Sequence, residues 1–98
     1  MDGLYTVVEF SEDDKWFVIS EKIINNIKYS YLIRVNKNED DFIDEFQVVK
    51  SSYDNNQEYM EPVEDKELLK KIMPILMPES EKYIKNPEKL KDLLNKVS

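Results

Sequence analysis

The sequence predicts an α+β fold: an antiparallel β-meander of four to five strands followed by two to three short C-terminal helices. Residues 27–35 alternate apolar and polar side chains over nine positions, which is typical of a half-buried strand. An Asn-Asn pair directly before this stretch favours a tight hairpin. From Asp65 onward the apolar residues recur at helical spacing instead. A run of strands followed by a run of helices indicates an α+β domain.

The strands are predicted from their β-branched and aromatic residues and from the polar turns between them. They occupy residues 4–10, 16–24, 27–35, 42–49 and 58–63. Residues 36–41 form a loop, and residues 50–57 form a turn-rich connection. Pro62 makes the last segment an edge strand or a strand end, because proline donates no ladder hydrogen bond.

The hairpin before residue 27 can pair in two registers. A two-residue Asn25-Asn26 turn pairs Ile24 with Ile27 and Lys22 with Tyr29. A three-residue loop, residues 24–26, gathers the apolar residues on one face instead. Its pairs are Ile23 with Ile27, Ile19 with Tyr31, and Phe17 with Ile33. Because a slip of one residue moves a whole side-chain set to the other face, burial favours the three-residue loop, with Asn26 left-handed.

The helices begin at recognisable caps. Asp65 is a suitable N-cap. Pro74 is expected to end or kink the first helix near Met73, because an interior proline removes a hydrogen bond and clashes with the preceding turn. A second helical piece is expected to start at Pro78. Asn86 caps a terminal amphipathic helix, in which proline takes the first position and four apolar residues follow at i, i+3, i+4 and i+7: Leu90, Leu93, Leu94 and Val97.

Length and charge describe a single acidic domain. The 98 residues, 41% of them hydrophobic, suffice for one domain spanning 1–98. It divides into a strand-rich acidic part, 1–63, and a helical Lys-rich part, 64–98. Residues 1–65 hold sixteen acids and six bases, a net of −10, whereas residues 66–98 hold five acids and eight bases, a net of +3. The acidic part could present a single-sign recognition face or simply a solvated surface.

The net charge of −7 indicates which partners to expect. It argues against direct binding to nucleic acid or to an anionic membrane and favours a protein partner with a basic surface. The absence of Cys and of a basic signal segment predicts a cytoplasmic protein. The absence of Ala, with abundant Ile, Asn and Lys, is typical of an AT-rich genome, such as that of a low-GC bacterium, its phage or its plasmid. The oligomeric state is left open.

The sequence predicts a protein that is not an enzyme. Without His and Cys it lacks imidazole bases, thiol nucleophiles and the usual zinc ligands, so no catalytic residue and no metal ligand is assigned. The single Gly3 precludes a Gly-rich phosphate loop, and no cofactor is expected. Aligned with an EF-hand loop that starts at Asn36, the chain has Asp41 where Gly is required and Gln47 where Glu is required. Residues 54–58 are interpreted as a polar turn.

The candidate partner-binding residues are carboxylates of the NEDDFIDEF stretch and two tyrosines that flank a turn and are expected to be exposed. They are Glu39, Asp40, Asp41, Asp44, Glu45, Tyr53 and Tyr59. Asp44 lies between Phe42 and Phe46 in the alternation. It should therefore face inward, unless a bulge or the strand end frees it. Six other aromatic residues are expected in the core: Trp16, Phe17, Tyr29, Tyr31, Phe42 and Phe46.

Three stretches of the chain resemble the YrzB-like family of small acidic bacterial proteins of unknown function. They are IINNIKYSYLIRV, NEDDFIDEFQVV and EYMEPVEDKELLKKI. The resemblance extends from residue 16 to about residue 73, and the Lys-rich tail from Pro78 onward departs from the pattern. The family implies no catalytic residues, so none is carried over.

Two functional hypotheses follow from the acidic character. The first is a non-catalytic interaction module that binds a protein partner through an acidic face or an open sheet edge. The second is a phage- or plasmid-encoded inhibitor whose carboxylates mimic nucleic acid, of the anti-CRISPR or anti-restriction type, with Glu12, Asp13 and Asp14 as helpers. A mimic requires the carboxylates to form one continuous stripe. A housekeeping domain whose acidity only provides solubility is the remaining alternative.

Overall fold

The computed structural model describes residues 4–97, and it confirms the predicted fold class. Five strands form one antiparallel sheet in the order β1-β2-β3-β4-β5, which is a simple meander. They are β1 Val7–Ser11, β2 Asp14–Ile24, β3 Ile27–Val35, β4 Phe42–Asp54 and β5 Gln57–Pro62. Two helices follow, α1 Lys66–Ile84 and α2 Pro87–Val97.

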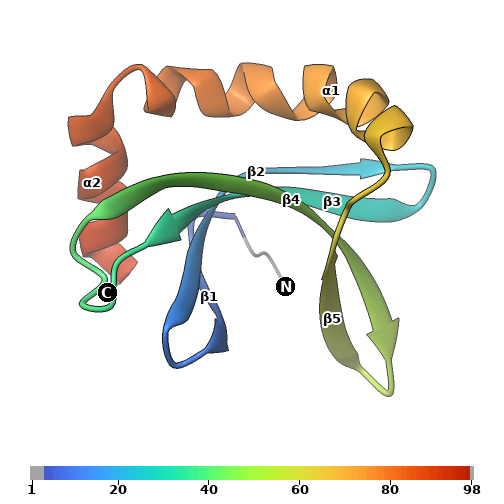
Figure 1. The fold of residues 1–98 in the computed structure, drawn as a ribbon, viewed down its shortest axis with the longest axis horizontal. Helices are drawn as coiled ribbons and strands as arrows, with labels where there is room; N and C mark the ends of the chain where they lie inside the picture. Colours follow the sequence, from blue (N-terminus) through green and yellow to red (C-terminus); the bar gives the residue numbers. More distant parts are fainter. Residues whose placement is uncertain (1–3, 98) are drawn as a thin grey trace.

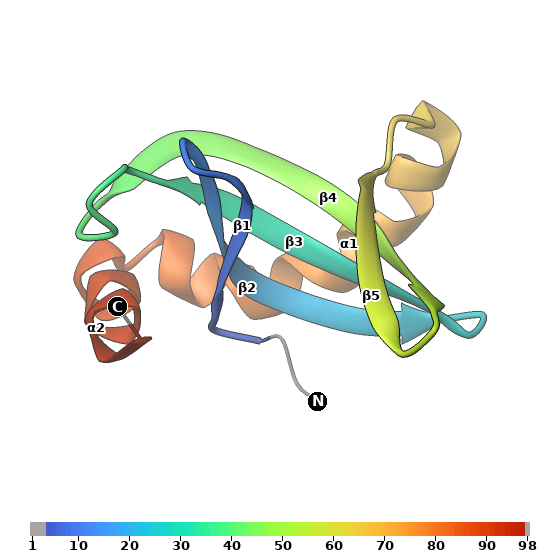
Figure 2. The same ribbon diagram turned by 90° about the horizontal axis from the view of Figure 1, so that it is seen from below.

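The sheet is curled, so both of its faces bury apolar residues. Both helices lie against one face, while β1 and β5 curl away on the other side (Figures 1 and 2). The larger core, which includes Phe17, Tyr31, Leu76 and Leu94, lies between sheet and helices. A smaller core fills the inside of the curl, and its buried residues are Trp16, Val18, Leu32 and Val49.

The β2–β3 hairpin corrects the preferred register. Its turn has two residues, Asn25 and Asn26, with φ of 52° and 66°, and it pairs Ile24 with Ile27. Such a turn matches the twist of the strands, and Asn tolerates positive φ, so turn geometry outweighs the apolar pattern here. A β-bulge between Val18 and Ser20 then shifts the pairing by one residue. Beyond the bulge Phe17 lies opposite Ile33, as the three-residue loop predicted.

A second Asn-Asn hairpin replaces the expected turn-rich connection at residues 50–57. Asn55 and Asn56 have φ of 51° and 66°, nearly the same values as the first pair. β4 therefore continues to Asp54, five residues beyond the predicted end, and β5 begins at Gln57. Pro62 ends β5, an edge strand, as its missing N–H requires.

α1 is longer than predicted because neither proline ends it. The Asp65 side chain accepts hydrogen bonds from the backbone of Glu67 and Leu68, which confirms the N-cap. Pro74 and Pro78 both lie inside the helix, so Pro78 starts no separate helix. Figure 1 shows α1 changing direction after its first turns. Ile72 and Leu76, on either side of Pro74, are 2% and 0% exposed, and this burial keeps the helix on the sheet.

Of the six aromatic residues expected in the core, five pack into one of the two cores and Phe46 is the exception. Trp16, Phe17, Tyr29 and Tyr31 are buried as predicted. Phe46 is 37% exposed, which corrects its assignment to the core. Its ring stacks on Tyr31 with 5.5 Å between the centroids and still remains partly accessible to water.

Candidate functional site

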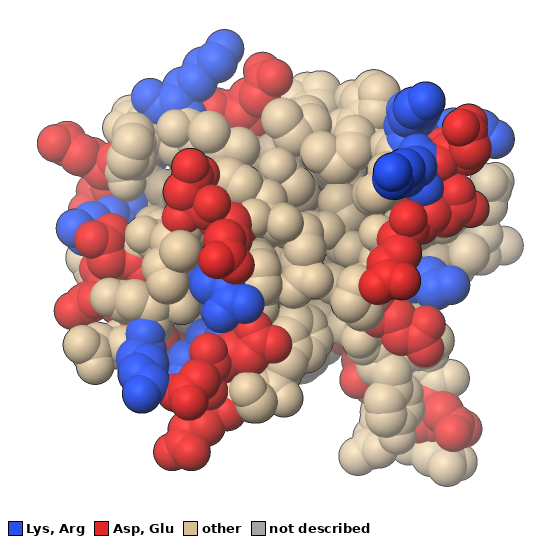
Figure 3. All heavy atoms as spheres, viewed as in Figure 1, with Lys and Arg blue, Asp and Glu red and all other residues tan. Residues whose placement is uncertain are grey.

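The meander places the β1–β2 turn and the β3–β4 loop at the same end of the sheet. Residues 9–15 and 34–45 make up this acidic end. They contain nine acids and three bases, a net of −6 out of −7 for the whole chain. Figure 3 shows charged side chains of both signs gathered at this end, on the left of the view, with uncharged surface beside them. The topology thus concentrates charge that the sequence distributes over two separate segments.

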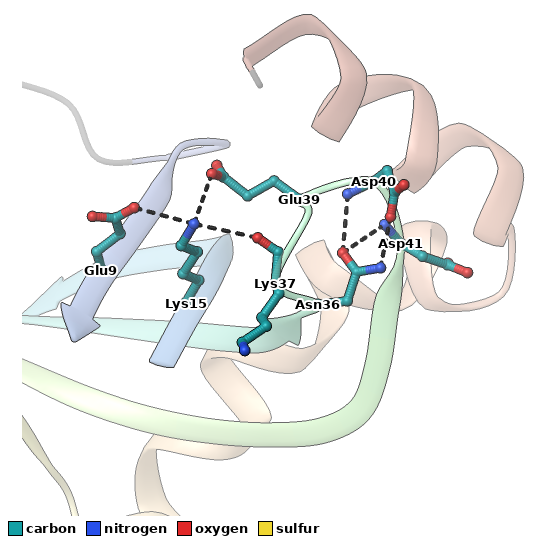
Figure 4. A network of polar contacts seen from close by, with 7 residues as sticks. All are labelled: Glu9, Lys15, Asn36, Lys37, Glu39, Asp40 and Asp41. Atoms are coloured by element: carbon teal, nitrogen blue, oxygen red, sulfur yellow. Dashed lines mark hydrogen bonds and ion pairs between the residues drawn. The ribbon is translucent and has the colours of Figure 1, made fainter. Parts of the chain in front are cut away.

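Lys15 links the two segments. Its Nζ lies 3.5 Å from Glu9 Oε1 and 3.1 Å from Glu39 Oε2, and it also donates a hydrogen bond to the carbonyl of Lys37 at 3.4 Å (Figure 4). The hydrogen bond to Glu39, aided by the charges of Glu39 and Glu9, raises the pKa of Lys15 despite some desolvation. Lys15 therefore stays protonated, and it holds Glu39 against β1.

Asn36 organises the β3–β4 loop from within. Its side-chain oxygen accepts from the backbone N–H groups of Asp40 and Asp41 at 3.0 and 3.3 Å, and its amide donates to the Asp40 carboxylate at 2.6 Å. Figure 4 shows the result: Glu39 points toward Lys15, whereas Asp40 and Asp41 lie on the opposite side of the loop, toward α2. Asn in such a loop commonly replaces a backbone turn bond with its own side chain.

Arg34 holds Glu45 on the face of the sheet opposite the helices. Its Nε donates to Glu45 Oε2 at 2.8 Å, and its Nη2 lies 3.3 Å from Asp14 Oδ1. The guanidinium also lies over the Trp16 ring, 4.7 Å from the centroid. Glu45 and Asp14 therefore share one base of this chain, and the three side chains keep a net charge of −1.

A bulge in β4 decides where Asp44 points. The register changes from Ile33 opposite Phe46 to Val35 opposite Phe42, so residues 43–45 together oppose Arg34. This irregularity releases Asp44 from the alternation that would have buried it, and the residue is exposed. Among the described residues the side chain of Asp44 has no hydrogen-bond or ion-pair partner.

Asp44 lies on the rim of a groove between β4 and the second helix. The groove has a volume of about 400 Å³. Its wall on the sheet side includes Ile33, Phe42, Ile43 and Phe46, and its wall on the helix side includes Tyr83, Ile84, Pro87 and Leu90. Three carboxylates, those of Asp41, Asp44 and Glu88, lie on its border together with Lys91. Nζ of Lys91 is 3.8 Å from Asp41, and both side chains are at least half exposed. The groove is thus apolar inside and predominantly acidic at its edge.

The structure groups the predicted site residues only in part. Asp41 and Asp44 border the groove, and Asp40 lies beside them. Glu39 and Glu45 instead form ion pairs with bases of this chain, Lys15 and Arg34. The two tyrosines belong to another region, because the β4–β5 hairpin lies at the opposite end of the sheet (Figure 2). They are 63% and 48% exposed, as predicted for Tyr53 and Tyr59, but they cannot contact the groove.

Sequence reasoning missed the groove because it forms between distant segments. The sequence indicates no binding role for Ile43, and for the terminal helix that contains Pro87, Glu88 and Lys91 it predicts only amphipathic packing. The available signal was the apolar side of residues 87–97, which must pack against some strand of the sheet. The identity of that strand depends on the path of α1, which local spacing does not specify.

Comparisons with protein-family models, curated protein sequences and solved structures found no significant match to this chain. The resemblance to the YrzB-like family thus stays a prediction. Among the side chains that the structure describes, which leave out Glu79, no group of three or more acidic, His or Cys residues is arranged to hold a metal ion. No helix in this described part has the length and apolar character needed to cross a membrane.

Proposed function

We propose that this protein is a non-catalytic interaction module that binds a protein partner with a basic surface through its acidic end. The observation that carries the proposal is the net charge of −6 on residues 9–15 and 34–45, next to an apolar groove. A charged rim around an apolar centre is the usual anatomy of a recognition surface. The acids steer a basic partner toward the surface, and the apolar centre supplies the contact area.

The ion pairs at this end are suited to exchange with a partner. Lys37–Asp13 and Lys91–Asp41 have distances of 3.3 and 3.8 Å, and all four side chains are at least half exposed. Exposed pairs of this kind contribute about 0–1 kcal/mol, so a basic residue of a partner can replace the internal base at little cost.

A nucleic-acid mimic is the second candidate, and the segregation of charge is the observation that favours it. Six of the nine carboxylates at the acidic end, however, already pair with a base of this chain. They are Glu9, Asp13, Asp14, Glu39, Asp41 and Glu45. A stripe in which acids and bases alternate imitates a phosphate backbone poorly, because each internal base offsets a phosphate-like charge. We therefore favour the interaction module.

The test compares three chains immobilised for capture from an extract of the source cell. One is the unaltered chain, one carries Asp40→Asn, Asp41→Asn and Asp44→Asn, and one is a control with three other exposed carboxylates neutralised. The control changes are Asp54→Asn, Glu61→Gln and Glu64→Gln. We expect the unaltered chain and the control to retain the same partner, and the first variant to lose it. Retention by all three chains, or by none, contradicts the proposal.

Competition with duplex DNA separates the two candidates. A mimic occupies the DNA-binding groove of its target, so added DNA should release the captured partner, and the partner should itself bind DNA. An interaction module of the kind proposed here binds a basic surface that need not contact DNA. Release by DNA in proportion to the partner's affinity for DNA would favour the mimic instead.

A further inference from the structure

The groove between β4 and α2 has a chemistry that narrows the kind of partner. We propose that it receives one bulky apolar side chain of a partner segment, and that basic residues on both sides of that side chain contact Asp41, Asp44 and Glu88. This inference rests on the proposed function. It adds the sequence pattern that the partner segment would carry, which is an apolar residue between lysines or arginines.

The apolar interior argues for an apolar side chain. Ile43 and Phe46 are 41% and 37% exposed, whereas Leu90 and Ile33 beneath them are 3% and 6% exposed. The bottom of the groove therefore consists of buried side chains, whereas its side walls are still partly exposed to water. Covering these walls removes apolar surface from water, which is the main favourable term in association. The volume of about 400 Å³ lies within the usual range for a binding cleft.

The rim argues for basic neighbours on either side. Three carboxylates and one lysine border the groove, a local net charge of −2. Among the described residues the side chain of Asp44 has no hydrogen-bond or ion-pair partner. The Asp41 carboxylate accepts a hydrogen bond from the Phe42 backbone N–H at 2.8 Å, and its one base is Lys91, at 3.8 Å. Two positive charges of a partner would balance this rim, with Lys91 as the internal competitor.

The exposed rim favours an extended segment over a second copy of the chain. Asp41, Asp44, Pro87 and Glu88 are all exposed, so the groove is open along its border and a chain can pass across it. A second copy would bring another net charge of −7 to an acidic surface, which self-repulsion opposes. A basic peptide has the complementary sign.

The test uses two defined peptides, one with a leucine between two runs of three lysines and one with serine at the central position. Binding is followed by NMR chemical shifts of the isotope-labelled chain. We expect the leucine peptide to bind about tenfold more tightly or better, since burying a leucine side chain corresponds to at least that ratio. Its largest shifts should lie at Phe42, Ile43 and Leu90. The serine peptide should shift mainly the acidic residues.

Two substitutions at matched positions locate the effect. Ile43→Ser removes an exposed wall of the groove without changing charge, and we expect it to abolish most of the preference for leucine. Ile23→Ser is the control, because Ile23 is a 73% exposed strand isoleucine at the opposite end of the sheet. It should leave the preference unchanged. Lys91→Gln removes the competing base and should tighten binding of both peptides.

The outcomes separate this inference from the proposed function. The two peptides could bind equally, and binding of both could be lost when Asp40, Asp41 and Asp44 become Asn. That result overturns the proposed role of the groove and still agrees with the proposed acidic interaction module. No binding, or binding unaffected by that triple change, overturns both. Shifts at the groove that depend on protein concentration without peptide would identify a second copy as the occupant, and they would also overturn the inference.

Discussion

Two ion pairs in this molecule have the same length and different surroundings. Arg34 Nε and Glu45 Oε2 are 2.8 Å apart at the acidic end, where the side chains are 28% and 57% exposed. Lys28 Nζ and Glu58 Oε2 are also 2.8 Å apart, near the opposite end, where the side chains are 8% and 22% exposed. The distance alone therefore does not distinguish a pair that stabilises the fold from one that a partner could exchange.

The surroundings of Lys28 show why its pair belongs to the fold. Ser51 donates a second hydrogen bond to Glu58 at 2.6 Å, and Lys28 Nζ lies 6.0 Å from the centre of the Tyr53 ring. Desolvation acts to lower the pKa of Lys28, but the hydrogen bond to Glu58 and the charge of Glu21 outweigh it, so the pKa is raised. For Glu58 desolvation acts in the upward direction, and the hydrogen bonds from Lys28 and Ser51 outweigh it, so its pKa is lowered.

The largest expected effect is on the buried pair. Lys28→Ala leaves the Glu58 carboxylate largely buried with Ser51 alone, and it removes the cation that also attracts Glu21. We expect the free energy of unfolding to fall by about 2–4 kcal/mol, measured by urea denaturation followed through Trp16 fluorescence. The control Lys37→Ala breaks an exposed pair and should cost less than about 0.5 kcal/mol. Equal costs would remove the distinction between the two regions.

Replacing both partners of the buried pair tests the same point differently. The double change Lys28→Met with Glu58→Met removes both charges together, so neither is left uncompensated. We expect its stability to be within about 1 kcal/mol of the unaltered chain and above that of Lys28→Ala. A double variant less stable than Lys28→Ala would show that the pair itself, and not the orphaned charge, provides the stability.

The pH dependence of stability is the next effect in size. Because the pKa of Glu58 is lowered by folding, its contribution is present above the unfolded value near 4.5 and is lost as pH falls through the folded pKa. The raised pKa of Lys28 gives the opposite limit, since that contribution is lost only as pH rises above about 10.5.

The measurement compares the unaltered chain with Glu58→Gln by denaturation from about pH 7 down to about pH 3. The stability difference between the two chains should shrink as pH falls below 4.5, the ordinary value for Glu58. A difference that stays constant over this range would show that ionisation of Glu58 does not contribute.

Arg34 is expected to contribute less than the buried pair, although it has more partners. It contacts Glu45, Asp14 and the Trp16 ring, but water reaches all of the charged groups. We expect Arg34→Ala to cost about 1 kcal/mol in unfolding free energy, mostly from lost packing on Trp16. Arg34→Lys keeps the charge and loses the planar stacking, so it should recover only part of this. Full recovery by lysine would assign the effect to charge alone.

The smallest effect is expected at Glu45. Glu45→Gln removes one exposed carboxylate from an already acidic end, so we expect a change within about 0.5 kcal/mol that diminishes further as salt is added. Glu58→Gln should be more costly and less sensitive to salt. Calorimetric unfolding of both variants at low and high salt provides the comparison. Similar salt dependence would contradict the difference in burial.

The sequence predicted the elements well and their details unevenly. The alternation at residues 27–35 and the caps at Asp65 and Asn86 were sufficient to locate β3 and both helix starts, because these signals are local. The hairpin register was wrong at the turn and right beyond it, because a bulge near Ile19 reconciles turn geometry with burial. Pro74 did not end α1, since tertiary packing of Ile72 and Leu76 outweighs the local cost.

The candidate site shows the same division between local and tertiary information. The sequence located the carboxylates of NEDDFIDEF and the exposure of the two tyrosines, because loop and turn residues remain at the surface. It did not predict that Glu39 would form an ion pair with Lys15, or Glu45 with Arg34. Those contacts join residues far apart in the chain, and composition carries no information about them.

By itself, the sequence determined an acidic α+β meander without thiol or imidazole chemistry, since period, caps and residue types are local properties. Only the tertiary structure decided that residues 9–15 and 34–45 share one end, that a bulge frees Asp44, and that α2 completes an apolar groove beside it. The physical reason is that each of these features depends on where separate segments meet. That is decided by burial of the two cores as a whole, not by the preference of any one segment.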